Sequence, residues 1–343
     1  MKLFRNDKII IAIILMSVIL FSGCTNEQSS EQLSETRLLL DTFCTITIHG
    51  AVDSGLLDEA FALCEELEAL FSITVEGSDV WRINHAGGEP VTVDPRTIEV
   101  IRAGLSFGEL TGGMFDITIG RLSRLWDFSE AGSGSSFYDL RIPSDAEIAQ
   151  ARITVDYRQV IISGDTVQLA DPEAWIDLGA IAKGYIGDMV AEFLKERGVS
   201  GALISLGGDV VAVGDRLDGN PWRIALRNPF NTEGEWLGVF EVTGASVISS
   251  GTYERRFEVD GVRYHHILDP NTGMPVLTDV ISATVVVEDA MLGEGLSTAA
   301  VLLGSCCAME LFDQASGVLG AVLVLEDGTI LEYGGLDCFV RSQ

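Results

Sequence analysis

Basic residues are scarce in this sequence of 343 residues, which has 22 lysines and arginines against 51 aspartates and glutamates. The formal net charge of −29 argues against a nucleic acid partner, because binding to a phosphate backbone needs a basic surface. An acidic protein that binds an anionic ligand generally needs a metal cation or oriented backbone N–H groups. Hydrophobic residues make up 47% of the chain, enough for the core of one large domain or two closely packed ones.

Cysteine and histidine are also few, with six and four residues. The cysteines form no CxxC pair and no Cys/His spacing of the kind that holds zinc. Cys44 and Cys64 lie in apolar patterns, which predicts buried core positions. A disulfide remains open for a protein outside the cytoplasm, and the sequence assigns no pairing.

The apolar run Ile9–Phe21 is too short for a stable membrane span and follows three basic residues, which is typical of an export signal. It ends in Phe-Ser-Gly-Cys, which resembles the bacterial lipobox with Cys24 as the lipidated residue. We therefore expect a lipoprotein signal peptide at 1–23 and a palmitate-bearing chain anchored to the extracytoplasmic face of the cell membrane. The alternatives are ordinary signal cleavage nearby or an uncleaved anchor.

Polar residues follow Cys24, so residues 24–36 are expected to form a flexible tether and residues 37–343 the folded domain. Periodicity predicts a strand at 38–48, and a short strand is expected at 153–155. Glycines lie on both sides of the acid in the segment 114–126 and a tryptophan follows soon after, which alone dictates no chemistry. The alternative to a functional role is a surface loop whose tryptophan fills the core. The remaining elements are expected as follows: helices at 53–71, 95–110, 145–151 and 290–303, and strands at 160–162, 166–169, 202–204, 210–213, 222–226, 238–242, 245–248, 256–259, 262–266, 280–287, 321–325 and 330–333.

The stretch Trp175–Tyr185, WIDLGAIAKGY, is the most suggestive segment. It passes from an apolar strand end through Asp177, Gly179 and Ala180 into a helix that carries Lys183 and is expected to run to about Arg197. A glycine turn before a helix offers free backbone N–H groups and the positive end of the helix dipole, which suits a phosphate. The alternative is a tight strand-to-helix connection with a solvated lysine.

Three other segments are hydroxyl-rich, glycine-rich or acidic turns. Gly207 and Gly208 precede an acid in SLGGD, where glycine permits a ligand to approach the backbone, although a β-bulge is the alternative. SSGTY, with Ser250 and Gly251, is a similar turn. His266 lies beside a turn rich in Asp and Gly, so it is a candidate general base, or a structural histidine.

Glu294 and Thr298 are four residues apart on an expected helix, so they share one face. A carboxylate and a hydroxyl are hard oxygen ligands suited to magnesium. The alternative is an exposed glutamate and a threonine bonded back to its own helix.

Taken in order, these segments resemble the ApbE family of flavin transferases over roughly residues 37–335. The resemblance rests on DT at 41–42, the loop 78–84, TGGMFDITIG with LW at 125–126, WIDLGAIAKGY, SLGGD, SSGTY, HILDPNTG and EGLST. It implies an α+β fold with mixed or antiparallel sheets, flanking helices and an FAD cleft between lobes.

The resemblance also implies roles for single residues. Magnesium is bound through the backbone carbonyl of Ala180 and the side chains of Glu294 and Thr298, where Glu294 replaces the family's usual aspartate. His266 and Asp269 assist the acceptor hydroxyl. The residues expected to bind FAD are Leu40, Asp41, Thr42, Met114, Phe115, Asp116, Asp177, Lys183, Gly207, Gly208, Ser250, Gly251, His266 and Ile267. Leu40 stands where Met is frequent, and Asp41 replaces a common glycine.

The implied activity is magnesium-dependent transfer of FMN from FAD to a threonine or serine hydroxyl, with release of AMP. The implied acceptor is a flavoprotein with a threonine-containing motif, such as a subunit of a membrane redox pump. The first alternative is hydrolysis of FAD to FMN and AMP at the same site. A non-catalytic FAD-binding lipoprotein and a generic solute-binding lipoprotein are alternatives from other classes.

Overall fold

The computed structural model describes residues 32–50, 53–128, 141–230, 234–334 and 338–342. The predicted signal peptide and Cys24 lie outside these residues. Contacts group Gln32–Gln343 into one unit. Within the described ranges, no helix combines the length and the apolar character that a membrane crossing requires.

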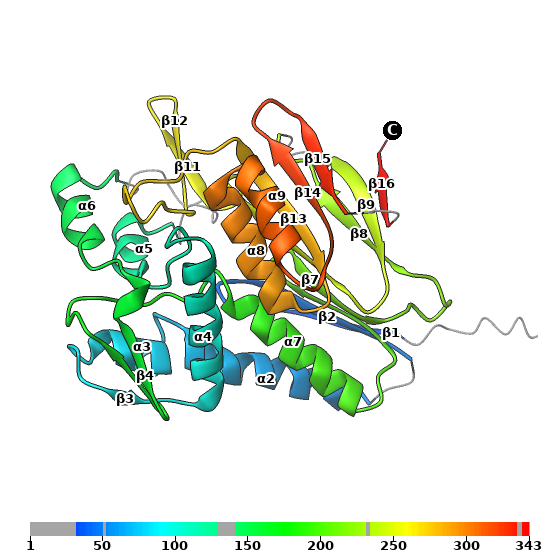
Figure 1. Ribbon diagram of the computed structural model, residues 1–343. Helices are drawn as coiled ribbons and strands as arrows, with labels where there is room; N and C mark the ends of the chain where they lie inside the picture. The colour runs from blue at the N-terminus through cyan, green and yellow to red at the C-terminus, as the bar shows by residue number, and fades with distance from the viewer. Residues whose placement is uncertain (1–31, 51–52, 129–140, 231–233, 335–337, 343) are drawn as a thin grey trace, which may run out of the picture. The chain divides into compact units, whose positions relative to one another are not determined.

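An eight-stranded sheet runs through the centre of this unit, and its neighbouring strands pair antiparallel (Figure 1). In spatial order, its strands are β1 (Gln32–Leu39), β2 (Thr42–His49), β6 (Gly201–Leu206), β7 (Asp209–Gly214), β10 (Ser246–Gly251), β13 (Val280–Val287), β14 (Val318–Leu325) and β15 (Ile330–Tyr333).

Alternate residues of the central strands enter two different cores, because successive side chains of a strand point to opposite faces. In β7, Val211 and Val213 belong to the larger core, whereas Val210 and Ala212 belong to a second one. The larger core lies under the helices α2 (Gly55–Phe71), α7 (Ala182–Glu196), α8 (Ala290–Leu303) and α9 (Ser305–Gln314). The second core is closed by the sheet of β8 (Trp222–Arg227), β9 (Trp236–Val242) and β16 (Phe339–Arg341).

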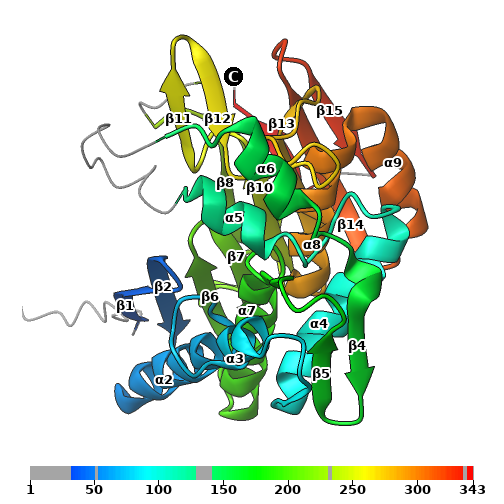
Figure 2. The same cartoon turned by 90° about the vertical axis from the view of Figure 1, so that its left-hand side faces the viewer.

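A third, smaller core joins two short helices to a hairpin (Figure 2). The helices are α5 (Gly120–Trp126) and α6 (Asp145–Arg152), and the hairpin is β11 (Arg256–Val259) with β12 (Val262–His265). The remaining elements are α3 (Asp79–His85), β3 (Val91–Thr92), α4 (Pro95–Leu110), η2 (Tyr157–Gln159), β4 (Val160–Ser163) and β5 (Thr166–Leu169).

Local sequence explains where several helices begin. Asp94 caps α4 by accepting the N–H of Arg96, and Pro95 stands at the first position, where its missing N–H costs nothing. Ser144 and Glu147 form a reciprocal capping box at the start of α6. Each such cap contributes about 1 kcal/mol to stability.

The predicted α+β architecture is confirmed, and its sheets are antiparallel. The single strand predicted at 38–48 is wrong, because the chain reverses at Leu40 and Asp41 and forms the β1–β2 hairpin. Both residues have positive φ, 56° and 54°, a conformation that glycine and asparagine adopt most readily. The strand β1 begins at Gln32, so the predicted tether at 24–36 overlaps it.

Two further predictions of local structure are wrong. Residues 120–126 form helix α5 rather than loop, although Trp126 fills a core as expected. The segment 153–155 is a turn, not a strand, and helix α9 was not anticipated. Cys44 and Cys64 are buried free thiols, as predicted.

Candidate functional site

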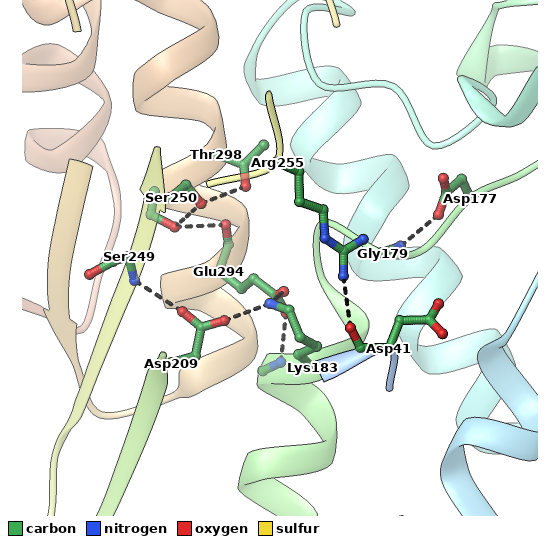
Figure 3. A network of polar contacts seen from close by, with 12 residues as sticks. Asp41, Asp177, Gly179, Lys183, Asp209, Ser249, Ser250, Arg255, Glu294 and Thr298 are labelled. Atoms are coloured by element: carbon green, nitrogen blue, oxygen red, sulfur yellow. Dashed lines mark hydrogen bonds and ion pairs between the residues drawn. The ribbon is translucent and has the colours of Figure 1, made fainter. Parts of the chain in front are cut away.

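Lys183 stands in the first turn of α7, and its ammonium lies between two buried carboxylates (Figure 3). Lys183 Nζ donates to Asp209 Oδ2 at 2.5 Å and also to Glu294 Oε1. The side chains of Asp209 and Glu294 are only 7% and 3% exposed. Burial by itself would lower the pKa of Lys183, but the two carboxylates outweigh it and hold the pKa above its ordinary value. Lys183 is therefore charged.

Glu294 also fixes the backbone at the start of α7. Its second oxygen, Oε2, accepts the N–H of Gly184 at 2.6 Å. Gly184 is in the first turn of α7, where N–H groups have no acceptor within the helix, so Glu294 supplies one. The N–H of Gly184 therefore does not occupy the carbonyl of Ala180. Burial raises the pKa of Glu294, and Lys183 opposes the rise.

Gly184 is required where α7 meets α8. A Cβ at this position would lie 2.4 Å from the carbonyl oxygen of Ala290, so any side chain would push the two helices apart. The close approach is what allows Glu294 to reach the first turn of α7.

Thr298 stands one turn after Glu294 and is linked to β10. Its Oγ1 lies 3.0 Å from Ser250 Oγ, which also lies 2.8 Å from Ser297 Oγ. On the same strand, the N–H of Ser249 donates to Asp209 Oδ1 at 3.1 Å. The predicted turn at SSGTY is wrong for its first three residues, which end strand β10 and pair with β13, and the turn begins only at Thr252. This strand end connects the Lys183–Asp209–Glu294 cluster to Thr298. A Cβ on Gly251 would lie 2.3 Å from the ring of Tyr253.

Asp188, also on α7, holds the N-terminus of α8. Its two oxygens accept the N–H groups of Ala290 and Met291, each at 2.9 Å. Burial raises the pKa of Asp188 to about 7 against the effect of these two bonds. Asp188 therefore sets the register of α8, which carries Glu294 and Thr298, on α7.

Replacing Asp188 with alanine is expected to lower the free energy of unfolding by about 1–3 kcal/mol, because two helix N–H groups lose their partners. Urea unfolding measures the change. Asp313→Ala is the matched control: Asp313 is exposed and accepts only the hydroxyl of Tyr333. An Asp188→Ala variant as stable as the control would contradict this role.

Two hairpin turns meet beside the cluster. Gly207 and Gly208 form the two-residue β6–β7 turn, with φ of 66° and 103°, so the β-bulge alternative is wrong. A Cβ on Gly207 would lie 2.8 Å from Thr42 Oγ1, whereas nothing lies within 4 Å of a Cβ on Gly208. In the facing turn, the carbonyl of Asp41 accepts Arg255 Nη2 at 3.4 Å, and the N–H of Leu40 donates to Glu68 Oε1 at 3.0 Å.

The predicted flavin-contacting segment Met114–Asp116 is largely structural in its contacts. Asp116 accepts the N–H and hydroxyl of Thr118 and the N–H of Tyr157, and burial raises its pKa. Phe115 is buried against Phe107. Only Met114 reaches another predicted motif, because its sulfur accepts Asn271 Nδ2 at 3.1 Å.

Asp177 stabilises a turn within its own segment. Its Oδ1 accepts the N–H of Gly179 at 2.9 Å, and its N–H donates to the carbonyl of Ile117 at 2.7 Å. WIDLGA therefore lies against the segment that contains Asp116.

His266 follows β12, and its N–H donates to the carbonyl of Arg255. Burial, assisted by Arg255 and His265, lowers the pKa of His266 to about 3, and its buried Nδ1 has no hydrogen-bond partner among the described residues. An unperturbed histidine has a pKa of about 6.5. His266 is therefore uncharged at neutral pH, but it is a weaker base than a free histidine.

Asp269 shapes the loop after His266. Its oxygens accept the N–H of Asn271 at 2.8 Å and the hydroxyl of Thr272 at 3.1 Å, and neither bonds to His266. Ile267 is buried, and its carbonyl accepts the N–H of Val276. The predicted assistance of Asp269 to an acceptor hydroxyl stays a prediction.

His265 is buried, and its Nε2 lies 3.1 Å from the carbonyl oxygen of Val276. Burial lowers its pKa to about 4. Between pH 6.5 and 4 the unfolded chain therefore binds a proton at this residue that the folded chain does not, so its contribution to stability falls as pH falls.

Replacing His265 with glutamine should remove this pH dependence. Between pH 7.5 and 4.5, we expect the wild type to lose about 2–3 kcal/mol more of its free energy of unfolding than the variant does. Urea unfolding at both pH values measures the two losses, and equal losses would contradict this expectation.

Sequence reasoning missed three residues of the site. Asp209 is the acid of the recognised segment SLGGD, and Arg255 follows SSGTY by two residues, so an acid and a base close to these segments were signals that could have included them. Asp188 had no signal, because its partners are backbone groups a hundred residues away. Among the described residues, no cluster of three or more His, Cys, Asp or Glu side chains is arranged to hold a metal. A carbonyl, one carboxylate and one hydroxyl, the predicted ligands, are a different kind of donor set.

Comparisons with known proteins agree on one family. The sequence profile described as the ApbE family matches residues 40–323. The chain is 32% identical to the FAD:protein FMN transferase of Vibrio cholerae, covering 93% of this chain and 95% of the relative. It is 31% identical to the protein of the same name from Treponema pallidum, covering 93% and 91%.

Solved structures give the same result. The flavin transferase ApbE from Vibrio cholerae superimposes with a TM-score of 0.77 and 30% identity, covering 89% of this chain and 97% of that one. The ApbE protein from Thermotoga maritima superimposes with a TM-score of 0.80 and 33% identity, covering 91% and 100%.

Proposed function

The chain belongs to the ApbE family, and on that basis we propose that it transfers FMN from FAD to a threonine or serine hydroxyl of an acceptor flavoprotein. The bond formed joins the acceptor oxygen to the phosphorus of the FMN half. The bond broken is the pyrophosphate link, and AMP leaves. The observation that carries the proposal is the convergence of Lys183, Asp209, Ser250, Glu294 and Thr298 from four separate family motifs.

The donor set at this place fits a magnesium ion. The carbonyl of Ala180 is not taken by Gly184, Glu294 has lone pairs beyond its two hydrogen bonds, and Thr298 adds a hydroxyl. All are hard oxygen ligands, and magnesium prefers such ligands. Bound there, the ion would neutralise charge that builds up on the pyrophosphate.

Other groups of the protein would bind the pyrophosphate and activate the acceptor hydroxyl. Lys183 offers a fixed positive charge, and the backbone at Gly208 is open to an approaching ligand. His266, uncharged at neutral pH, is the proposed acceptor of the hydroxyl proton, and Asp269 holds the loop on which it stands.

Hydrolysis is the second candidate, since water in place of the acceptor hydroxyl would give FMN and AMP at the same site. The names of the relatives favour transfer. We further propose that a lipid on Cys24 anchors the enzyme to the extracytoplasmic face of the membrane, near flavin-bearing subunits of redox pumps. Labelling with a palmitate analogue, lost in Cys24→Ser, tests the anchor.

The test of function is incubation with FAD and magnesium, with and without an acceptor domain, followed by quantification of FMN and AMP. Transfer predicts AMP formation that depends on the acceptor, with little free FMN. Equal amounts of free FMN and AMP without acceptor would instead show hydrolysis.

A further inference from the structure

Among the described residues is an open cavity of about 580 Å³ whose lining does not include Lys183. It is lined by α5, α6, the end of α3 and Trp175, and a volume of this size suits a small ligand or a short peptide stretch. Three arginines, Arg121, Arg124 and Arg141, face it, in a protein with a net charge of −29. The cavity is therefore a local basic site on an acidic molecule.

The guanidinium groups are not equally engaged. Arg141 forms a bidentate pair with Glu147, at 3.0 and 2.8 Å, which shows that a carboxylate fits at this wall. Arg121 donates to the backbone carbonyl of Glu173 at 3.2 Å, and it lies 3.9 Å from the side-chain carboxylate of the same residue. Arg124 has no carboxylate partner among the described residues.

Arg124 lies instead over an aromatic row. Its guanidinium is 4.8 Å from the ring centre of Trp175, which is 5.0 Å from His85, which in turn stacks on Trp81 at 4.1 Å. This stacking fixes the plane of the guanidinium and leaves its N–H groups to bind an anion. Arg124 is thus held with its N–H groups available to a carboxylate, and Arg121 stands three residues before it on the same helix.

The cavity lies beside two segments of the candidate site, WIDLGAIAKGY and the loop that begins at His266. Trp175 stands two residues before Asp177 and five before Ala180. The two helices that line the cavity also contact the loop after β12: Arg152 of α6 donates to the carbonyl of Asn271 at 2.6 Å, and Trp126 of α5 donates to that of Gly273 at 2.8 Å. Both acceptors belong to the loop that begins at His266.

We propose that this cavity binds an acidic segment of the acceptor polypeptide, near the residue that receives FMN. The inference rests on the proposed function, because it assigns the acceptor of that same reaction. Charge complementarity supports a peptide rich in Asp and Glu: the acidic surface would repel such a segment elsewhere, and Arg121 and Arg124 would hold it here.

The test uses the full protein and the soluble domain of a redox-pump subunit that is flavinylated by a known transferase. We expect the charge reversals Arg121→Glu and Arg124→Glu each to raise the Kd and the KM for this acceptor roughly tenfold, and the double variant more. The KM for FAD and the rate at saturating acceptor should stay unchanged. Arg223→Glu is the matched control, an exposed arginine of β8 paired with Glu241, and it should behave as wild type.

A charge swap tests direct contact. An acceptor in which the acidic residues around its FMN-accepting threonine are changed to lysine should bind the double variant better than the wild type. Unchanged acceptor affinity in the double variant would overturn the proposal, and so would a raised KM for FAD, which would make the cavity part of the FAD site. Binding is measured without FAD, so wild-type protein that binds the acceptor but never transfers FMN would refute the proposed function alone.

Discussion

Replacing Glu294 with alanine is expected to reduce FMN transfer by a factor of about 1,000, which makes it one of the two largest effects that the structure predicts. Glu294 contacts Lys183 through one oxygen and Gly184 through the other, and it is the only carboxylate in the proposed magnesium site. Its loss removes a metal ligand and also leaves the N–H of Gly184 without its acceptor.

Conservative variants separate the metal role from a structural one. Glu294→Asp restores the residue usual in the family and should keep activity with magnesium, whereas Glu294→Gln keeps the shape but should need far more magnesium. Urea unfolding should show that the alanine variant remains folded, with a loss of about 1–3 kcal/mol from the unpaired groups. If Glu294→Ala transfers FMN normally after metal is stripped, the metal assignment is wrong.

Replacing His266 with alanine is expected to reduce transfer by about 100- to 10,000-fold while FAD still binds. The imidazole is uncharged at neutral pH and lies next to Arg255, whose guanidinium reaches the turn at Asp41. The rate is measured at saturating FAD and acceptor, and FAD affinity by quenching of flavin fluorescence. Full transfer activity in His266→Ala would rule out the role.

The pH dependence adds an independent check. Because the pKa of His266 is about 3, its neutral form is present throughout the range above pH 4. Titration of His266 should therefore cause no fall in the wild-type rate near pH 6.5. Any fall seen there should persist when His266 is replaced. NMR of the imidazole should show no protonation of His266 between pH 5 and 8.

The positions of the motif segments along the chain were predictable, because each combines glycine with an acid, a base or a hydroxyl at a strand end. WIDLGAIAKGY does begin a helix, and Glu294 and Thr298 do share one helix face. The hairpin at Leu40–Asp41 was not predictable in the same way, since neither residue gives a turn signal although both adopt positive φ.

The connections between segments depend on tertiary packing and were beyond pattern reasoning. The bond from Gly184 to Glu294 forms only because α7 and α8 approach closely at Gly184. The bond from Lys183 to Asp209 depends on the packing of α7 against β7. The pKa of His266 departs from its ordinary value because of burial, which no local sequence encodes. The basic cavity likewise assembles from four segments that are separate in the chain.

The most direct measurement of the central claim is intact and peptide-level mass spectrometry of an acceptor domain after incubation with this protein, FAD and magnesium. The account predicts one FMN on a threonine or serine of the acceptor, with an equal amount of AMP, and no adduct when magnesium is chelated. An unmodified acceptor beside FMN and AMP in equal amounts would contradict transfer, and an adduct formed equally well without magnesium would contradict the role of Glu294.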